Sequence, residues 1–430
     1  DEEIVLPTKA GEPFSFTRAA PKGTKIGYKY QGKTKFIEVG AEAKFTVNVV
    51  SPEKEETVAV GIAAPDGSTA FERVRVKSAD KVARKKMPFD LIRRIANSKA
   101  SPYLTDGKAY FYYAGEAKSV MLAGDFTNWA PRIQLEKVDD GLFVKRVDLD
   151  NSARAEYKLI IDGKWMIDPG NPQKIDNGVG GENSIVEMPD YEPGKWGSEV
   201  KRSPLDPKIS EMEVTSDKYG TRKIKIYIPS EYFKRGIAPK LPVLYMLDGS
   251  EYISRAKAVQ VLEDLVAAKK VEPFMLVFTD PVDRQKEYWA SDEYADYIAK
   301  EVVPAVEKKY FTTIKTGREN RAVLGASLGG ITSIWIGLRH PDKFKNIGGQ
   351  SSSFWVDNER VVKALRRLNG DEKFNFYLDD GIFEGVKDTR RVNVMLRGKG
   401  FPVKYIEGKD GHNWTSWRDR LGDAFITLMK

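Results

Sequence analysis

Cysteine is absent from this 430-residue sequence, and histidine occurs only twice, as His340 and His412. Without cysteine there are no disulfides, thiol nucleophiles, cysteine-based zinc sites or iron–sulfur clusters. Two histidines are too few for a three-histidine metal site, so we expect chemistry that needs no metal and no cofactor. Long apolar runs are absent too. None approaches the ~18 residues of a transmembrane helix, so no membrane span is predicted.

A strong excess of charge is also lacking. The net charge of +8 is the small difference between 70 basic and 62 acidic residues spread along the chain, which does not favour nucleic acid as a partner. The first residues, Asp-Glu-Glu-Ile, lack the apolar stretch of a signal peptide. We therefore expect a cytoplasmic protein, or a periplasmic or secreted one if a signal peptide was removed before Asp1.

The pattern of strands, helices and turns divides the chain into three domains and two connectors. Two segments show short strand patterns separated by turn residues, which indicate small β-sandwiches. Between them lies a basic segment with helical spacing, and after them a Pro/Gly-rich linker. The predicted parts are a β-sandwich (1–80), a basic helical linker (81–102), a second β-sandwich (103–190), a linker (191–209) and an α/β domain (210–430).

The last and largest segment alternates strands with helices. Val243–Leu247 and Phe274–Phe278 are continuous apolar runs, as expected for central strands of a parallel sheet. Alternation over about 220 residues predicts one doubly wound, mostly parallel α/β domain. The predicted fold class is therefore α/β, preceded by two small all-β domains.

The sharpest local motif is Gly325-Ala-Ser327-Leu-Gly329, which follows the expected strand 321–324 and precedes the expected helix 328–338. A G-x-S-x-G motif between a strand and a helix forms a nucleophile elbow, with the serine hydroxyl exposed on a tight turn. Ser327 is the candidate nucleophile.

A serine nucleophile needs a histidine base. His340 lies at the end of the helix that follows Ser327, roughly 20 Å away along that helix, which is too far. His412 follows the expected strand 403–406, and a loop at the carboxyl end of a strand is where the base belongs. His412 is the candidate base.

The acid that orients the histidine should follow the expected strand 374–378. Four acids compete there: Asp379, Asp380, Glu384 and Asp388. Spacing alone does not choose among them, since acids are also common in turns and at helix N-termini.

Two backbone N–H groups should stabilise the oxyanion that forms during ester hydrolysis. One is expected from Leu328, directly after the nucleophile, and the other from the loop after the strand Val243–Leu247. In that loop the candidates are Gly249 and Ser250.

At residues 205–430 the sequence resembles the esterase-D type of α/β-hydrolase, and most closely the ferric enterobactin (enterochelin) esterases. The motifs that carry the resemblance are Leu247-Asp-Gly249, Gly325-Ala-Ser-Leu-Gly-Gly330, Gly349-Gln-Ser-Ser-Ser-Phe-Trp355, Gly381-Ile-Phe-Glu384 and Gly411-His-Asn-Trp414. The resemblance implies that Glu384 is the acid and that Arg284 and Trp355 bind substrate. Asp410-Gly411-His412 replaces the family's Gly-Gly-His. Related feruloyl and acetyl-xylan esterases usually have His-Gly where this chain has Asp248-Gly249, and this departure leans away from them.

Residues 105–188 resemble a family 48 carbohydrate-binding module, of the Ig-like or E-set type, through Leu122-Ala-Gly-Asp-Phe-Thr-Asn-Trp129 and Tyr157–Trp165. The family's sugar contacts fall on Trp129, Lys158, Trp165 and Asn183. Alternatively, the two tryptophans pack against the hydrolase domain.

The resemblances together imply a serine carboxylic-ester hydrolase with an ester substrate of one of two classes. The first is a ferric siderophore trilactone, whose negative charge would suit Arg284, unless Arg284 instead pairs with Glu287. The second is a feruloyl or acetyl ester on a polysaccharide, which the middle domain would bind. A non-catalytic glycan-binding protein and an acyltransferase remain as alternatives.

Overall fold

The structure is a computed structural model that describes residues 87–178, 180–197, 209–234 and 239–430 in full, and the backbone of strands within residues 2–78. The chain divides into two compact units, Asp1–Phe89 and Asp90–Lys430. Two interpretations fall partly outside the described residues, namely the basic connector at 81–86 and the linker at 198–208.

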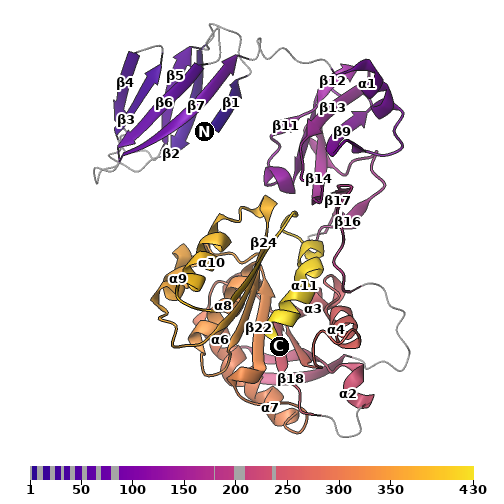
Figure 1. Ribbon diagram of the computed structural model, residues 1–430, viewed down its shortest axis with the longest axis vertical. Coiled ribbons are helices and arrows are strands. Elements are labelled where there is room, and N and C mark those ends of the chain that lie inside the picture. Colours follow the sequence, from indigo (N-terminus) through magenta and orange to yellow (C-terminus); the bar gives the residue numbers. More distant parts are fainter. Residues whose placement is uncertain are drawn as a thin grey trace. The chain divides into compact units, whose positions relative to one another are not determined.

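Seven strands are described within residues 2–78 of the first unit, as expected for a β-rich segment (Figure 1). They form a five-stranded sheet in the order β1-β7-β6-β3-β4 and a two-stranded sheet, β2-β5. All pairs are antiparallel except β1 with β7. The strands are β1 (Glu2–Leu6), β2 (Pro13–Ala19), β3 (Lys25–Tyr30), β4 (Lys33–Glu38), β5 (Lys44–Val50), β6 (Glu56–Ala63) and β7 (Thr69–Ser78).

The second unit begins with the helix α1 (Phe89–Ala96) and two antiparallel sheets, the β-domain. One sheet has the order β12-β13-β9-β8, and the other β11-β10-β14-β17-β16 with β15 paired to β14. The strands are β8 (Tyr103–Thr105), β9 (Lys108–Ala114), β10 (Val120–Gly124), β11 (Ile133–Gln134), β12 (Glu136–Asp139), β13 (Leu142–Val147), β14 (Arg154–Ile161), β15 (Lys164–Met166), β16 (Lys174–Asp176) and β17 (Glu182–Glu187). The 3₁₀ turn η1 (Asp125–Thr127) follows β10.

An apolar core fills the space between these two sheets. Phe111, Leu122, Tyr157 and Leu159 are fully buried in it. Alternate residues of neighbouring strands supply these side chains, as in a sandwich of two sheets.

The rest of the second unit is built on one eight-stranded sheet in the order β18-β19-β21-β20-β22-β23-β24-β25. β19 pairs antiparallel with both of its neighbours, β18 and β21, and all the other neighbouring strands pair in parallel. The strands are β18 (Ser210–Ser216), β19 (Gly220–Tyr227), β20 (Val243–Leu247), β21 (Met275–Thr279), β22 (Arg321–Ala326), β23 (Asn346–Gln350), β24 (Asn375–Gly381) and β25 (Val403–Gly408). The prediction of a mostly parallel α/β-hydrolase sheet preceded by β-sheets is confirmed.

Helices cover both faces of this sheet, each over its own apolar core (Figure 1). One face carries α3 (Gly249–Ser254), α4 (Ala258–Ala267) and α11 (Trp414–Leu428). The other carries α6 (Asp292–Tyr297), the π-helical turn η2 (Ile298–Val302), α7 (Val303–Lys309), α8 (Leu328–Arg339), α9 (Val356–Arg367) and α10 (Lys387–Gly398). The short helices α2 (Ser230–Lys234) and α5 (Arg284–Glu287) and the 3₁₀ turns η3 (Arg318–Asn320) and η4 (Ile382–Glu384) complete the domain.

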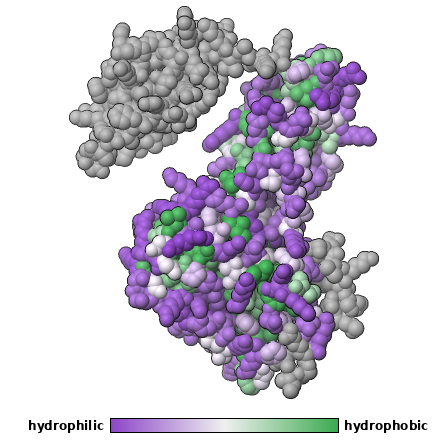
Figure 2. All heavy atoms as spheres, in the orientation of Figure 1, coloured by the Kyte–Doolittle hydropathy of each residue, from purple (hydrophilic) through white to green (hydrophobic). Residues whose placement is uncertain are grey.

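The described part of the linker packs against the hydrolase helices. The Tyr191 hydroxyl donates to Asp419 on α11 at 2.5 Å, and the Gly197 N–H donates to Asp264 on α4 at 2.8 Å. The face of the second unit drawn in Figure 2 is mostly hydrophilic, with scattered apolar patches. Among the described residues, no helix has the length and apolar character needed to cross a bilayer.

Candidate active site

Ser327 lies at the tip of the tight turn between β22 and α8. Its backbone has φ 58° and ψ −120°, a conformation that L-residues rarely adopt. The turn closes because Gly325 and Gly329 touch: a Cβ on Gly325 would lie 2.3 Å from the Gly329 carbonyl oxygen. Two of the motif's glycines therefore make the close approach that presents the serine side chain.

Three of the predicted residues meet at the carboxyl edge of the sheet. His412, in the turn between β25 and α11, places Nε2 2.8 Å from Ser327 Oγ. Its Nδ1 lies 2.5 Å from Oε2 of Glu384, which is the last residue of η4 after β24. Three segments far apart in sequence thus form a continuous line of hydroxyl, imidazole and carboxylate.

The three competing acids point elsewhere. Asp379 is fully buried and accepts hydrogen bonds from Gln350 and the Tyr377 hydroxyl, both at 2.8 Å. Asp380 accepts a 2.7 Å hydrogen bond from the Thr389 hydroxyl. Asp388, on α10, forms an ion pair with Arg391. Glu384 therefore is the acid that the structure brings to His412.

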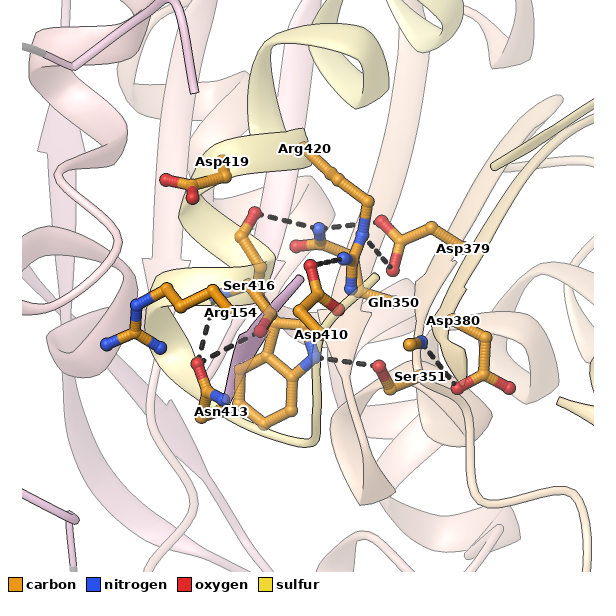
Figure 3. Close-up of polar contacts among 12 residues, drawn as sticks. Arg154, Gln350, Ser351, Asp379, Asp380, Asp410, Asn413, Ser416, Asp419 and Arg420 are labelled. Atoms are coloured by element: carbon orange, nitrogen blue, oxygen red, sulfur yellow. Dashed lines mark hydrogen bonds and ion pairs between the residues drawn. The ribbon is translucent and has the colours of Figure 1, made fainter. Parts of the chain in front are cut away.

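Figure 3 shows a buried polar cluster around Arg420, which includes Ser351, a hydrogen-bond partner of Glu384. Arg420 on α11 pairs with Asp410 at 2.5 Å and with Asp379 at 3.3 Å. The Trp417 indole donates to Ser351 Oγ at 2.8 Å, and Ser351 Oγ donates to Glu384 Oε1 at 2.9 Å. Because each of these groups is held by another, the carboxylate of Glu384 is fixed in orientation.

Electrostatics set the ionisation of His412 and Glu384. Burial acts to lower the pKa of His412, but the hydrogen bond and charge of Glu384 outweigh it and raise that pKa above 6.5. Burial acts to raise the pKa of Glu384, but His412 and Arg420 outweigh it and lower that pKa. The pair is therefore arranged as a carboxylate beside a strengthened base.

A pH dependence follows from this arrangement. The base must be unprotonated to accept the serine proton, so activity rises as His412 loses its proton. Because the pKa of His412 is raised above 6.5, kcat/KM for a neutral ester should rise along an acid limb centred above that value. Initial rates between pH 5 and 9 measure the limb, and a limb centred clearly below 6.5 would contradict the arrangement.

The three predicted oxyanion donors are Leu328, after the nucleophile, and Gly249 and Ser250, in the loop after β20. Leu328 begins α8, so its N–H belongs to the first turn, where no intrahelical acceptor exists. Gly249 begins α3 after Asp248, which has a φ of 55°. The Ser250 N–H already donates to Asp280 Oδ1 at 2.8 Å, and the Ser250 side chain lines a separate hollow beside Lys225. Because the Ser250 N–H already has an acceptor, the N–H of Gly249 remains the predicted second oxyanion donor.

Arg284 is held by a partner that the sequence did not indicate. Its guanidinium forms a bidentate ion pair with Asp248, at 2.9 and 2.7 Å. The alternative expectation of an Arg284–Glu287 pair is wrong, because Glu287 forms its own bidentate pair with Arg222 at 2.8 Å. Spacing along the chain did not reveal these partners, because Asp248 follows β20 and Arg222 lies on β19. The same is true of Asp280, the partner of Ser250, which follows β21.

A cavity of about 730 Å³ opens onto Ser327 and His412. Its opposite wall is the β-domain: all four predicted sugar-contact residues line it, namely Trp129, Lys158, Trp165 and Asn183. The alternative, that the two tryptophans pack against the hydrolase domain, stays a prediction. They line a shared cavity, however, and the Trp165 side chain is still 48% exposed.

Hydrogen bonds within the β-domain hold two of these side chains. The Trp129 indole N–H donates to Asp125 Oδ1 at 3.0 Å, and the Asn183 amide donates to Glu156 Oε2 at 2.8 Å. Asp125 and Glu156 also line the cavity but were not predicted. Asp125 belongs to the motif Leu122–Trp129, which carries the resemblance to a carbohydrate-binding module. Membership of that motif was the one sequence feature that could have pointed to Asp125.

The remaining predicted residue, Trp355, lies beside a second, smaller hollow of about 190 Å³. Trp355 is 60% exposed, and its ring meets the Trp289 ring edge to face, with the ring centroids 5.5 Å apart. This hollow shares His412, Asp125 and Trp129 with the larger cavity. In the part of the chain that the structure describes, no group of three His, Asp or Glu side chains is arranged to hold a metal ion.

Two family models match the chain. Residues 218–428 match the family described as "Putative esterase", and residues 108–192 match "Glycogen recognition site of AMP-activated protein kinase". The two matched segments correspond to the eight-stranded α/β domain and to the β-domain.

Relatives and solved structures give the same division. An iron(III) enterobactin esterase of Escherichia coli is 24% identical over 279 residues, covering 62% of this chain and 68% of the relative. An endo-1,4-beta-xylanase/feruloyl esterase of Xylanibacter ruminicola is 24% identical over 291 residues, covering 64% of this chain but only 38% of the relative. The enterobactin esterase structure from Shigella flexneri superposes with a TM-score of 0.62 at 19% identity, covering 78% of this chain and 97% of that one, which shows the fold.

Proposed function

We propose that this chain, whose residues 218–428 are an enterobactin esterase-like domain of the esterase family of α/β-hydrolases, hydrolyses carboxylic esters with Ser327 as nucleophile, His412 as base and Glu384 as orienting acid. The observation that carries the proposal is the unbroken line from Ser327 Oγ to His412 Nε2 at 2.8 Å and from His412 Nδ1 to Glu384 at 2.5 Å.

The proposed reaction has two steps with one proton carrier. Ser327 Oγ attacks the ester carbonyl carbon while His412 Nε2 takes the hydroxyl proton. The N–H groups of Leu328 and Gly249 stabilise the oxyanion, and His412 then gives its proton to the departing alcohol. A water molecule then attacks the acyl-serine and loses a proton to His412. His412 returns this proton to Ser327 Oγ as the acid departs, which regenerates the free serine. Glu384 accepts a hydrogen bond from the Nδ1–H of His412, so that the unprotonated Nε2 faces Ser327.

We propose that the alcohol side of the substrate is a sugar. The aromatic faces of Trp129 and Trp165 and the polar groups of Lys158 and Asn183 line the cavity that reaches Ser327. Aromatic faces pack against the apolar side of a sugar ring, while amide and ammonium groups bind its hydroxyls. A glycan-linked acyl ester would therefore place its sugar on the β-domain and its carbonyl at Ser327.

Charge pairing favours this substrate over a ferric siderophore. The described lining contains five carboxylates and four Lys or Arg side chains, so the cavity carries no excess of positive charge. Its three arginines are neutralised: Arg255 by Asp176 at 2.8 Å, Arg284 by Asp248 at 2.7 Å and Arg418 by Asp419 at 3.1 Å. An anionic ferric catecholate complex would need unpaired cations in the same place.

Replacing Trp165 tests the sugar assignment. Trp165→Ala should raise KM for a soluble feruloylated oligosaccharide about tenfold, because roughly 1.4 kcal/mol of stacking is lost. It should leave kcat/KM for methyl ferulate within about twofold, since a small ester does not reach the β-domain. Met166→Ala is the matched control: Met166 is on the same strand, 37% exposed, and outside the described cavity lining.

The substrate panel also includes ferric enterobactin. A selective loss on ferric enterobactin in Trp165→Ala would overturn the sugar assignment in favour of the siderophore. An equal loss on the oligosaccharide ester and on methyl ferulate would make Trp165 part of the wall around the reacting ester. Absence of any ester turnover by the wild-type chain would overturn the hydrolase itself and leave a glycan-binding protein.

A further inference from the structure

The β-domain does more than line the cavity, because its turn η1 packs against both loops that carry the proposed catalytic side chains. The Asp125 side chain, only 5% exposed, lies directly on the backbone of Gly411: a Cβ on Gly411 would be 2.2 Å from Asp125 Cγ. Gly411 immediately precedes His412. Any side chain at position 411 would therefore push η1 and the His412 loop apart.

The next residue of the same turn contacts the other loop. The Phe126 ring meets the Phe383 ring edge to face, with centroids 6.4 Å apart. Phe383 immediately precedes Glu384, and it packs against the apolar core of the β-domain together with Phe126. The acid loop is thus anchored in the β-domain by an aromatic side chain.

Backbone hydrogen bonds tie these elements together. The N–H of Arg154, the first residue of β14, donates to the Lys409 carbonyl at 3.0 Å. The N–H of Phe383 donates to the Asp410 carbonyl at 3.2 Å, which joins the acid loop to the histidine loop. Asp125 is itself immobilised by the Glu156 N–H at 2.8 Å and the Trp129 indole at 3.0 Å.

We propose that the turn Asp125–Thr127 is a positioning element of the esterase site, which holds the His412 and Glu384 loops in register, so that hydrolysis of every ester depends on it whether or not a glycan is bound. This inference rests on the proposed function. It differs from the sugar-binding role because the contact between Phe126 and Phe383 joins the two domains and involves none of the four predicted sugar-contact residues. A misplacement of catalytic groups by about 1 Å can cost about 100-fold in rate.

The test is a double-mutant cycle on p-nitrophenyl acetate, an ester too small to reach the sugar-contact residues. Phe126→Ala and Phe383→Ala should each lower kcat about 10- to 100-fold with little change in KM. The double variant should be no slower than the slower single variant, since both remove one contact. Phe143→Ala is the control for damage to the β-domain, because Phe143 is 5% exposed in the other sheet.

Asp125→Asn gives a readout that simple destabilisation would not produce. The charged and titratable groups that face Asp125 are Glu156, Arg154 and His412. Burial and the charge of Glu156 raise the pKa of Asp125 to about 7. Where Asp125 is ionised, its negative charge helps to raise the pKa of His412. Removing that charge should therefore lower the pKa of His412 and move the acid limb of kcat/KM to lower pH.

The outcomes separate this inference from the proposed function. Wild-type turnover that Ser327→Ala abolishes establishes the hydrolase in the same assay. Against that background, unchanged kcat in Phe126→Ala, multiplicative losses in the double variant, or an equal loss in Phe143→Ala would each overturn the positioning role. Retained glycan affinity in Phe126→Ala, measured by affinity electrophoresis, together with the loss of kcat supports it.

Discussion

Replacing Ser327 with alanine should lower kcat on any ester substrate by about 10⁴- to 10⁶-fold while the fold is retained. The alanine keeps the backbone of the turn but removes the oxygen that lies 2.8 Å from His412 Nε2. What remains is the stabilisation of the oxyanion by backbone N–H groups and the binding of the substrate. The measurement is single-substrate kinetics on p-nitrophenyl acetate, with circular dichroism and thermal melting as the check on folding.

The partner variant extends this test. His412→Ala should be about as damaging as Ser327→Ala, and the double variant no worse than either, because the two side chains act as one unit. Ser254→Ala is the matched control, since Ser254 is exposed on α3 and its hydroxyl bonds only locally, to the Ser250 carbonyl. More than about a tenth of the wild-type kcat in Ser327→Ala would show that Ser327 is not the nucleophile.

The fold could be predicted because its signals are local. Strand and helix periodicity and the continuous apolar runs of β20 and β21 require no knowledge of the tertiary structure. The elbow at Ser327 is local as well, since Gly325 and Gly329 belong to one turn. Helix length and strand position were enough to select His412 over His340, because His340 lies at the far end of the helix after Ser327 and His412 lies in a loop at the carboxyl edge of the sheet.

The choice of acid could not be made from the residues alone, because four carboxylates lie within ten positions and their partners come from other elements. Asp379 faces Arg420 on α11, and Asp380 faces Thr389 on α10. A distant contact also affects Ser250. Its N–H was expected to stabilise the oxyanion, but it donates to Asp280, which follows β21. Only the family resemblance pointed to Glu384.

The relation between the two domains was the least predictable part. Gly411 and Asp125 are almost 290 positions apart, and no spacing rule connects them. The four residues predicted to contact a sugar were named through resemblance, but their location opposite Ser327 depends on how the β-domain is docked. That docking rests on contacts such as Arg255 with Asp176 at 2.8 Å, which periodicity does not encode.

Glu384→Gln should lower kcat about 10³- to 10⁴-fold, less than the loss expected for Ser327→Ala. Glutamine keeps the size of the side chain and can still accept from Ser351 and from the Gly381 N–H. Its amide would no longer favour a proton on His412 Nδ1, so the imidazole would adopt the tautomer that presents Nε2–H to Ser327. It would also lose the charge that raises the pKa of His412, so the remaining activity should extend to lower pH.

Asp380→Asn provides the decisive comparison, because Asp380 lies near the end of β24, four residues before Glu384. Burial and the charge of Glu384 raise the pKa of Asp380 to about 8, so it is mostly protonated at neutral pH. Asparagine closely mimics a protonated carboxyl group, and kcat should fall less than about tenfold. If Asp380→Asn proved more damaging than Glu384→Gln under the same conditions, the orienting acid would be Asp380, and the 2.5 Å contact between Glu384 and His412 would be structural only.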